Sequence, residues 1–463
     1  MPVFVWLRRR PWLAVVVWRL GLLGGAAACT NDPPEPASPP APLPAAVAPA
    51  PADAVVYEVF VRNFSAAGTF DAVIPRLDSI KNLGCNVLWL MPIHPIGQAR
   101  RVGTAGSPYS VRDYRAVSPD LGDLVAFDRL VAAAHQRGLA VVLDWVANHT
   151  SWDHAWIQQH PDWYTRDANG TIQPPQPTWQ DVADLNYNQA ELRREMIRSM
   201  RFWVQQHNVD GFRCDAADLV PDTFWKEALD SLQRVKTNLF LLAEGGNASH
   251  YASGFQLAYG WSFYEALRQV FRLNANVSAL AAAHAGELQN APAGRYRLRF
   301  TTNHDFTFTD GAPPDWYGSP AAAQAAYVAT LAYGAAPLLY NGQEAGDPTR
   351  LSLFEKQTVN WNYSPATTAF YRRLLRLYNQ LPALRNGTIT PATVSADAVG
   401  VLRATAQQRV AVLVNVRNRA VTVAVPAAWQ GSAWTDAQTN QAVPSGTSSL
   451  TLPAYGYALW RSQ

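Results

Sequence analysis

Residues 209–220 have the sequence VDGFRCDAADLV, a short apolar segment that carries the charged residues Arg213 and Asp215. Side chains two positions apart in a β-strand point to the same side. The guanidinium of Arg213 is therefore expected beside the carboxylate of Asp215, which it would keep ionised. A carboxylate held in this way at the end of a strand is able to act as a nucleophile, whereas an isolated Arg-x-Asp is more often a structural ion pair. The surrounding sequence has to decide between these two readings.

Apolar runs and helical patterns alternate on both sides of this stretch. Strands are predicted at residues 55–60, 86–93, 139–144, 210–215, 239–244, 255–259, 297–303 and 336–342. Helical spacing of apolar residues is found at 71–83, 124–137, 189–207, 222–234, 262–271, 277–288, 320–333 and 365–381. Near-continuous apolar strands are typical of a parallel sheet covered on both faces. Eight such units favour a TIM barrel, and no glycine-rich dinucleotide fingerprint follows the first strand, which argues against an open Rossmann sheet.

The chain outside this alternation divides into two further parts. After Asn386-Gly387 the pattern changes to short alternating runs broken by Gly, Asn, Pro and Ser, which predicts an antiparallel β-sandwich over residues 385–463. An irregular stretch at residues 150–185 interrupts the α/β pattern after the third strand. The barrel is therefore expected to comprise residues 54–149 and 186–384.

The N-terminal sequence indicates export. Residues 1–28 are interpreted as a signal peptide, because a basic cluster, an apolar run and small residues precede Cys29 as in a bacterial lipoprotein signal. Cys29 would then be lipidated, and the Pro- and Ala-rich residues 29–53 would form an extended tether. Arg19 interrupts the apolar run and Ala26 stands where Leu is usual, so secretion without lipid and an uncleaved anchor stay open. We expect a protein attached to a bacterial membrane, in the periplasm or at the cell surface, or secreted.

The composition limits the kinds of partner. Of the 463 residues, 48% are hydrophobic and 16% are charged, as in a globular protein. The formal net charge of +3 gives no reason to expect a nucleic acid as partner, and nothing indicates the oligomeric state. If Cys29 carries lipid, Cys85 and Cys214 remain; they are expected to be buried free thiols, with a disulfide between them left open.

Polar residues recur where the predicted strands end. They are Asp144 with Asn148-His149, Arg213 with Asp215, Glu244, and Asn303-His304-Asp305. A TIM barrel places its catalytic groups at the carboxyl ends of its strands. Carboxylates that meet there shift one another's pKa values, which suits a pair made of one ionised nucleophile and one neutral acid. A retaining glycosidase needs such a pair, so the whole set favours a catalytic site over separate structural ion pairs.

Four segments resemble, in order, the four signatures of the α-amylase superfamily, glycoside hydrolase family 13. They are LDWVANH (143–149), GFRCDAAD (211–218), LLAEGGN (241–247) and FTTNHD (300–305). Three more are similar to the motif at the end of that family's domain B, to its substrate-tyrosine loop and to its eighth strand: DLNYNQAELR (184–193), SPYSVRDYRAVSPDLG (107–122) and APLLYNGQE (336–344). The resemblance spans residues 55–381. It implies a hydrolase that cleaves α-1,4 bonds of starch, maltodextrins or related α-glucans with retention, and it makes residues 150–185 a short domain B.

The resemblance also implies catalytic roles. Asp215 would be the nucleophile, and Glu244 would be the general acid that later acts as the base. Asp305 would be the third carboxylate, which holds sugar hydroxyls and stabilises the transition state. Arg213 would keep Asp215 ionised, and Asp144 would support Arg213 and the pocket.

Substrate-binding roles follow in the same way. His149 and His304 would hydrogen-bond the sugar before the cleavage point, and Tyr109 would form its stacking floor. In this family the second signature often ends in Lys-His, whose side chains meet the glucan beyond the cleavage point. Asp218-Leu219 stands there instead, which puts binding on that side, and with it the preferred substrate, in doubt.

Two questions stay open at this level. The chemistry requires no cofactor, but Asn148 matches a ligand of the structural calcium in many α-amylases, and calcium takes six to eight oxygen ligands. Besides Asn148, only the carbonyl of Leu219 and unspecified acidic residues of domain B are available as donors. The alternatives for function are a glucan transferase or isomerase on the same site, and a non-catalytic glucan-binding surface protein, which would be expected to lack one of the three carboxylates.

Overall fold

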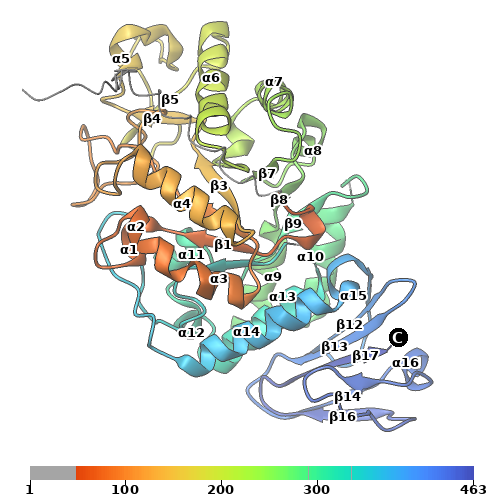
Figure 1. Ribbon diagram of the computed structural model, residues 1–463. Coiled ribbons are helices and arrows are strands. Elements are labelled where there is room, and N and C mark those ends of the chain that lie inside the picture. Colours follow the sequence, from red (N-terminus) through yellow and green to blue (C-terminus); the bar gives the residue numbers. More distant parts are fainter. Residues whose placement is uncertain (1–47, 290, 335, 463) are drawn as a thin grey trace, which may run out of the picture. The chain divides into compact units, whose positions relative to one another are not determined.

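The computed structural model describes residues 48–289, 291–334 and 336–462. Eight parallel strands form one sheet in the order β10-β1-β2-β3-β6-β7-β8-β9 (Figure 1). Their bounds are Val56–Val59 (β1), Val87–Leu90 (β2), Ala140–Trp145 (β3), Gly211–Cys214 (β6), Phe240–Ala243 (β7), Leu257–Tyr259 (β8), Tyr296–Leu298 (β9) and Leu338–Tyr340 (β10). A parallel bridge from Arg299 to Pro337 joins β9 to β10 and closes the sheet on itself. The prediction of a TIM barrel is confirmed.

Helices follow the barrel strands along the chain. The longer ones are α3 (Leu77–Leu83), α4 (Leu124–Gln136), α6 (Ala190–Gln206), α7 (Asp222–Gln233), α9 (Trp261–Arg272), α10 (Ser278–Leu288), α13 (Pro320–Ala332) and α14 (Pro365–Gln380). Short helices lie in the connections: α1 (Val61–Phe64), α2 (Phe70–Val73), α8 (Ser249–Ser253), α11 (His304–Thr309), α12 (Pro313–Trp316) and α15 (Pro382–Asn386). The single helix predicted at 71–83 is divided into α2, a 3₁₀ turn (Ile74–Arg76) and α3, because Pro75 cannot donate a helical hydrogen bond.

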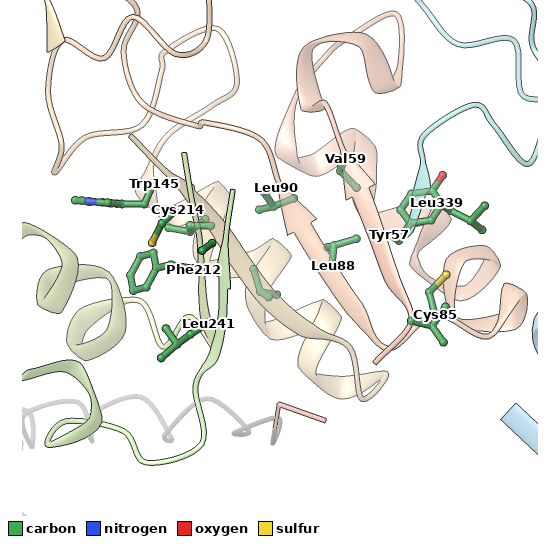
Figure 2. Close-up of a cluster of buried hydrophobic side chains, with 14 of the residues drawn as sticks. Tyr57, Val59, Cys85, Leu88, Leu90, Trp145, Phe212, Cys214, Leu241 and Leu339 are labelled. Carbon is green, nitrogen blue, oxygen red and sulfur yellow. The ribbon is translucent and has the colours of Figure 1, made fainter. Parts of the chain in front are cut away.

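Alternate residues of the strands belong to two separate cores. Val56, Trp89 and Val142 are members of the cluster that fills the barrel. Their neighbours along the strands, such as Leu88 and Phe212, belong to the cluster between the strands and the helices, part of which Figure 2 shows. This period of two decides which polar side chains reach the inside of the barrel, since residues of the same parity share one side.

The segment after β3 forms a small subdomain. Strand β4 (His149–Ser151) pairs antiparallel with β5 (Val182–Asp184), and between them lie α5 (Trp156–Gln159) and a 3₁₀ turn (Pro161–Trp163). Two of its tryptophans, Trp156 and Trp163, are buried against each other and contribute to the core of the subdomain.

The C-terminal region contains two antiparallel sheets, as predicted. One has the order β11-β12-β13-β17-β15 and the other pairs β14 with β16. The bounds are Thr388–Pro391 (β11), Ala398–Ala404 (β12), Arg409–Asn415 (β13), Val421–Ala424 (β14), Thr435–Asp436 (β15), Ser449–Leu452 (β16) and Tyr457–Ser462 (β17), with α16 (Ala427–Gln430) after β14. Arg417 connects this region to the barrel, because its guanidinium donates to the carbonyls of Val270, Asn274 and Ala275 at the end of α9.

Some predictions concern residues outside this description. The signal peptide, the lipidation of Cys29 and most of the tether fall within residues 1–47, which are not described. Within the described ranges, no helix combines the length and the apolar character that crossing a bilayer requires. Cys85 and Cys214 are both buried and free, so they form no disulfide with each other (Figure 2).

Candidate active site

The inward parity of the strands gathers the polar residues of the site. Glu58 on β1, Asp144 on β3 and Arg213 on β6 lie on the barrel side of their strands and are fully or almost fully buried. Asp215 and Glu244 follow the last residues of β6 and β7 with the same parity. Gly211 allows this arrangement, because a side chain there would collide with the backbone of Phe240 in the adjacent strand.

Arg213 holds three carboxyl groups together. Its Nη1 lies 2.8 Å from Asp144 Oδ1 and 2.8 Å from Asp215 Oδ1. Its Nη2 lies 2.7 Å from Glu244 Oε1, as an ion pair without hydrogen-bond alignment. Asp144 receives further hydrogen bonds on Oδ2 from the indole of Trp89 (3.2 Å) and the hydroxyl of Tyr109 (3.0 Å). One buried cation therefore serves three acids, more negative charge than it can neutralise.

This imbalance separates the carboxyl pKa values. Burial raises the pKa of Asp215 to about 6, although the charge of Arg213 opposes the rise. Burial raises the pKa of Glu244 further, to about 8, and the negative charges of Asp215 and Asp305 add to the effect against Arg213. At neutral pH the site therefore keeps Asp215 ionised and Glu244 protonated.

The backbone after β6 positions Glu244. Ala216 adopts a left-handed conformation (φ 43°, ψ 40°), which is uncommon for a residue with a side chain. In this conformation its N–H donates to Glu244 Oε2 at 2.7 Å. The residue that follows the proposed nucleophile thus fixes the carboxyl group of the proposed acid.

His304 is held as an imidazolium by its neighbours. Its Nδ1 lies 2.5 Å from Glu58 Oε1, and its Nε2 lies 2.8 Å from the hydroxyl of Tyr109 and 3.3 Å from Asp305 Oδ1. Because that hydroxyl donates to Asp144, it must accept from His304, so both ring nitrogens carry protons. Burial alone would lower the pKa of His304, but the charges of Asp305 and Glu58 outweigh it and raise the pKa to about 9.

A cavity of about 580 Å³ opens over these groups. Six of the residues predicted from sequence line it: Tyr109, His149, Asp215, Glu244, His304 and Asp305. Arg213 and Asp144 are buried beneath them. Burial lowers the pKa of His149 to about 4, so this second histidine faces the cavity neutral, in contrast to His304. Trp179, Trp261, Leu219 and Phe354 add apolar surface to the walls.

Asp218, which stands where the family often has Lys, connects two loops of the site. Its carboxylate accepts hydrogen bonds from the N–H of Gly246 (3.0 Å) and of Asn247 (3.4 Å), and lies 2.7 Å from His250 Nε2. Asp218 therefore ties the segment after the nucleophile to the loop that carries Glu244. Asp218 lines the cavity, and its carboxylate is already engaged by these three groups. A lysine at this position would instead be free to extend into the cavity.

The prediction of a structural calcium rests on Asn148, the carbonyl of Leu219 and acidic residues of domain B. Among the described residues, no group of three or more His, Cys, Asp or Glu side chains is arranged to hold a metal ion. Asn148 is buried, its side-chain amide nitrogen lies 3.1 Å from His149 Nδ1, and its backbone carbonyl accepts from the N–H of Leu185. Asn148 thus supports a cavity histidine and the domain B connection, and we derive no step through calcium.

Several residues of the site were not predicted. Glu58 and Trp89 lie on strands that were predicted from their apolar pattern. Each is a polar or indole side chain near the end of its strand, at a position that faces the barrel interior, and this could have indicated a site residue. Trp261 follows β8 directly and lines the cavity, so an aromatic residue just after a barrel strand was informative as well. Among the tryptophans of the rim loops, Trp179 is exposed in the cavity, whereas Trp152 packs under Arg100 and Trp316 packs against Arg272.

Known proteins share this architecture. Residues 52–372 match the family model for the alpha amylase catalytic domain, and residues 401–459 match that for the maltogenic amylase C-terminal domain. An alpha-amylase from Lactobacillus plantarum superposes with a TM-score of 0.81 at 30% identity, covering 89% of this chain and 99% of that chain. The maltogenic alpha-amylase AmyB from Thermotoga neapolitana also has a TM-score of 0.81, at 26% identity, with the same coverage.

Two relatives by sequence differ in activity. Alpha-amylase MalA of Haloarcula japonica is 29% identical over 430 residues, which cover 86% of this chain and 61% of that protein. An alpha-1,4-glucan:maltose-1-phosphate maltosyltransferase of Cereibacter sphaeroides is 35% identical over 213 residues, which cover 41% of this chain and 35% of that protein. The chain thus spans less than two thirds of either relative. Because the catalytic-domain model alone matches more than half of the chain, the protein belongs to the alpha-amylase family.

Proposed function

We propose that the protein is a retaining glycoside hydrolase that cleaves α-1,4-glucosidic bonds in starch, maltodextrins or related α-glucans. The observation that carries this proposal is the shared contact of Asp215 and Glu244 with one guanidinium, at pKa values of about 6 and about 8. An ionised nucleophile beside a protonated acid is the pair that the first step of retention needs. Two carboxyl groups bridged by one guanidinium also lie side by side, as a nucleophile and an acid must.

Each step of the reaction has a group to perform it. Arg213 engages Oδ1 of Asp215, which leaves Oδ2 to attack the anomeric carbon and form a covalent glycosyl-aspartate. As the bond to the leaving oxygen breaks, Glu244 gives that oxygen its proton. A water molecule then attacks the anomeric carbon, Glu244 takes the water's proton, and Asp215 departs as a carboxylate.

The cavity supplies groups that suit a sugar ring. Asp305 and His149 offer an acceptor and a neutral imidazole at its wall. Tyr109 stacks on His304 with ring centroids 5.3 Å apart, so the floor is aromatic and carries a positive charge beneath.

A transferase on the same site is the second candidate, and the maltosyltransferase among the relatives favours it. It differs only in the acceptor, because a sugar hydroxyl replaces water in the second step. Digestion of maltoheptaose separates the two: a hydrolase gives only shorter products, and a transferase also gives longer ones. Starch, pullulan, cyclodextrin and maltose, digested in parallel, identify the preferred substrate.

Proton NMR of the first products tests retention. We expect the new reducing ends to appear as the α-anomer before mutarotation. Initial formation of the β-anomer would exclude the proposed mechanism.

A further inference from the structure

A second cavity, of about 120 Å³, has arginines as five of its twelve lining residues. Its lining comes from α10, β9 and the end of α13 in the barrel region and from α15, β11 and β12 in the C-terminal region. Its lining includes five arginines, which we call the arginine cavity residues: Arg295, Arg297, Arg299, Arg385 and Arg403. None of them belongs to the catalytic site described above.

Acidic partners are too few for these arginines. In the described ranges only two carboxylates pair with them: Glu287 contacts Arg299, and Asp53 lies 2.8 Å from Arg385. Arg403 is 1% exposed and meets only backbone carbonyl oxygens, at 3.2–3.5 Å. Those contacts are long for hydrogen bonds from a charged donor, so they satisfy the guanidinium poorly.

Burial shifts the pKa values of two groups that line the cavity, Arg403 and His284. Burial lowers the pKa of Arg403 to about 10. Burial also lowers the pKa of His284 to about 3, and the charges of Arg299 and Arg403 lower it further. His284 is therefore neutral, and its Nδ1 faces Arg299 Nη2 at 3.2 Å as an acceptor. A buried cation without a counter-charge is costly, which makes an anion the natural occupant of this space.

Two guanidinium nitrogens of the lining arginines lack a hydrogen-bond partner in the part of the chain that the structure describes. Arg299 is 2% exposed, and its Nε has no hydrogen-bond partner among the described residues. Arg385 likewise has an unpartnered Nε. Buried donors in folded proteins are nearly always paired, so the protein itself leaves these two guanidiniums incompletely satisfied.

We propose that the arginine cavity binds one small tetrahedral oxyanion of the phosphate or sulfate class. Guanidinium forks match the oxygen spacing of such anions, and the cavity is several times larger than the ~10–15 Å³ that a water needs. The bound anion would join residues of the barrel to residues of the C-terminal region and stabilise the two together. The site is independent of the proposed reaction, because it shares no residue with the catalytic cavity.

The test measures binding of inorganic phosphate to the full-length protein by isothermal titration calorimetry, with ionic strength held constant by sodium chloride. We expect one site per chain and a melting temperature that rises with phosphate. The variant Arg295→Gln removes a half-buried cation of the lining and should weaken phosphate binding about tenfold, a loss of roughly 1.4 kcal/mol. The matched control is Arg372→Gln, which removes an exposed arginine of α14 and should bind phosphate like the wild type.

A second variant and a second ligand complete the test. Arg403→Gln should abolish binding, and Arg295→Gln gives the answer alone should Arg403→Gln not fold. Glucose 1-phosphate carries the same oxyanion on a bulky ring and should bind more weakly than phosphate. No saturable binding to the wild type, equal binding by Arg295→Gln and Arg372→Gln, or tighter binding of glucose 1-phosphate would each overturn the proposal.

Discussion

The catalytic cavity and the arginine cavity differ in the sign of their excess buried charge. In the first, one guanidinium contacts the carboxyl groups of Asp144, Asp215 and Glu244. In the second, five guanidiniums line one space, and among the residues that the structure describes two carboxylates pair with them. Burial, with the added charges of Asp215 and Asp305, raises the pKa of Glu244 and lets it keep a proton, whereas burial lowers the pKa of Arg403. The sign of the excess thus decides whether a buried site holds a proton or calls for a counter-ion.

The largest loss of activity is expected from replacing Asp215, the proposed nucleophile of the catalytic cavity. Asp215→Asn keeps the shape of the side chain but removes the attacking charge, so kcat on maltoheptaose should fall by at least ~10⁴-fold. Asp218→Asn is the control, because Asp218 lines the same cavity without contacting Arg213. Equal losses in the two variants would mean that Asp215 is no more than a wall of the cavity.

A smaller loss of activity is expected from replacing Glu244, the proposed general acid. Glu244→Gln cannot donate a proton, so kcat on maltoheptaose should fall by about 10²–10⁴-fold. The first-turnover release of fluoride from a glycosyl fluoride, whose leaving group needs no proton, should fall far less. In the wild type, activity should rise as Asp215 ionises near pH 6 and fall as Glu244 ionises near pH 8. On the fluoride, Glu244→Gln should lose the alkaline limb. An unchanged limb would assign the stored proton to another group.

The charge on His304 gives a third test. Glu58→Gln removes the carboxylate that contacts Nδ1, so the imidazolium should lose its proton at a lower pH and kcat/KM should fall about tenfold. Glu344→Gln is the matched control, since Glu344 is also a buried carboxyl group and pairs with Tyr57 on the same strand β1, outside the catalytic cavity. Carbon NMR of labelled histidines follows the titration directly. A histidine that titrates alike in both variants would contradict the role of Glu58.

Stability should show the smallest effect. The pKa of Glu244 is raised on folding, so the folded state binds more protons than the unfolded state between pH 4.5 and 8, and stability falls as pH rises through this window. Glu244→Gln removes this dependence. The fall in melting temperature from pH 5 to pH 8 should therefore be smaller in the variant, by about 1–3 °C in a calorimeter. An equal or larger fall would show that Glu244 does not hold a buried proton.

Local pattern was enough to predict the barrel and the core of its site. Arg213 and Asp215 could be placed on one face because strand parity is a local property, and the order of the polar strand ends could be read directly. Most of the strands are shorter than predicted: β9 ends at Leu298, and beyond the single bridge from Arg299 to Pro337 the apolar run continues as a buried connection.

The rest depended on contacts between distant parts of the chain. Glu58 meets His304 across 246 positions, and no local feature of either residue indicates the other. The arginine cavity combines β9 with β12 in the same way, so its five arginines read singly as ordinary surface charges. A local excess of cations or acids can be recognised only once the fold shows which charged residues lie together.

The most direct test of the central claim is to trap the covalent intermediate. Glu244→Gln is incubated with α-maltosyl fluoride, which needs no acid to react but meets no base to hydrolyse the product, and the protein is analysed by intact-mass and peptide mass spectrometry. The account predicts one added maltosyl group, located on Asp215. Consumption of the fluoride without an adduct, or an adduct on another residue, would contradict it.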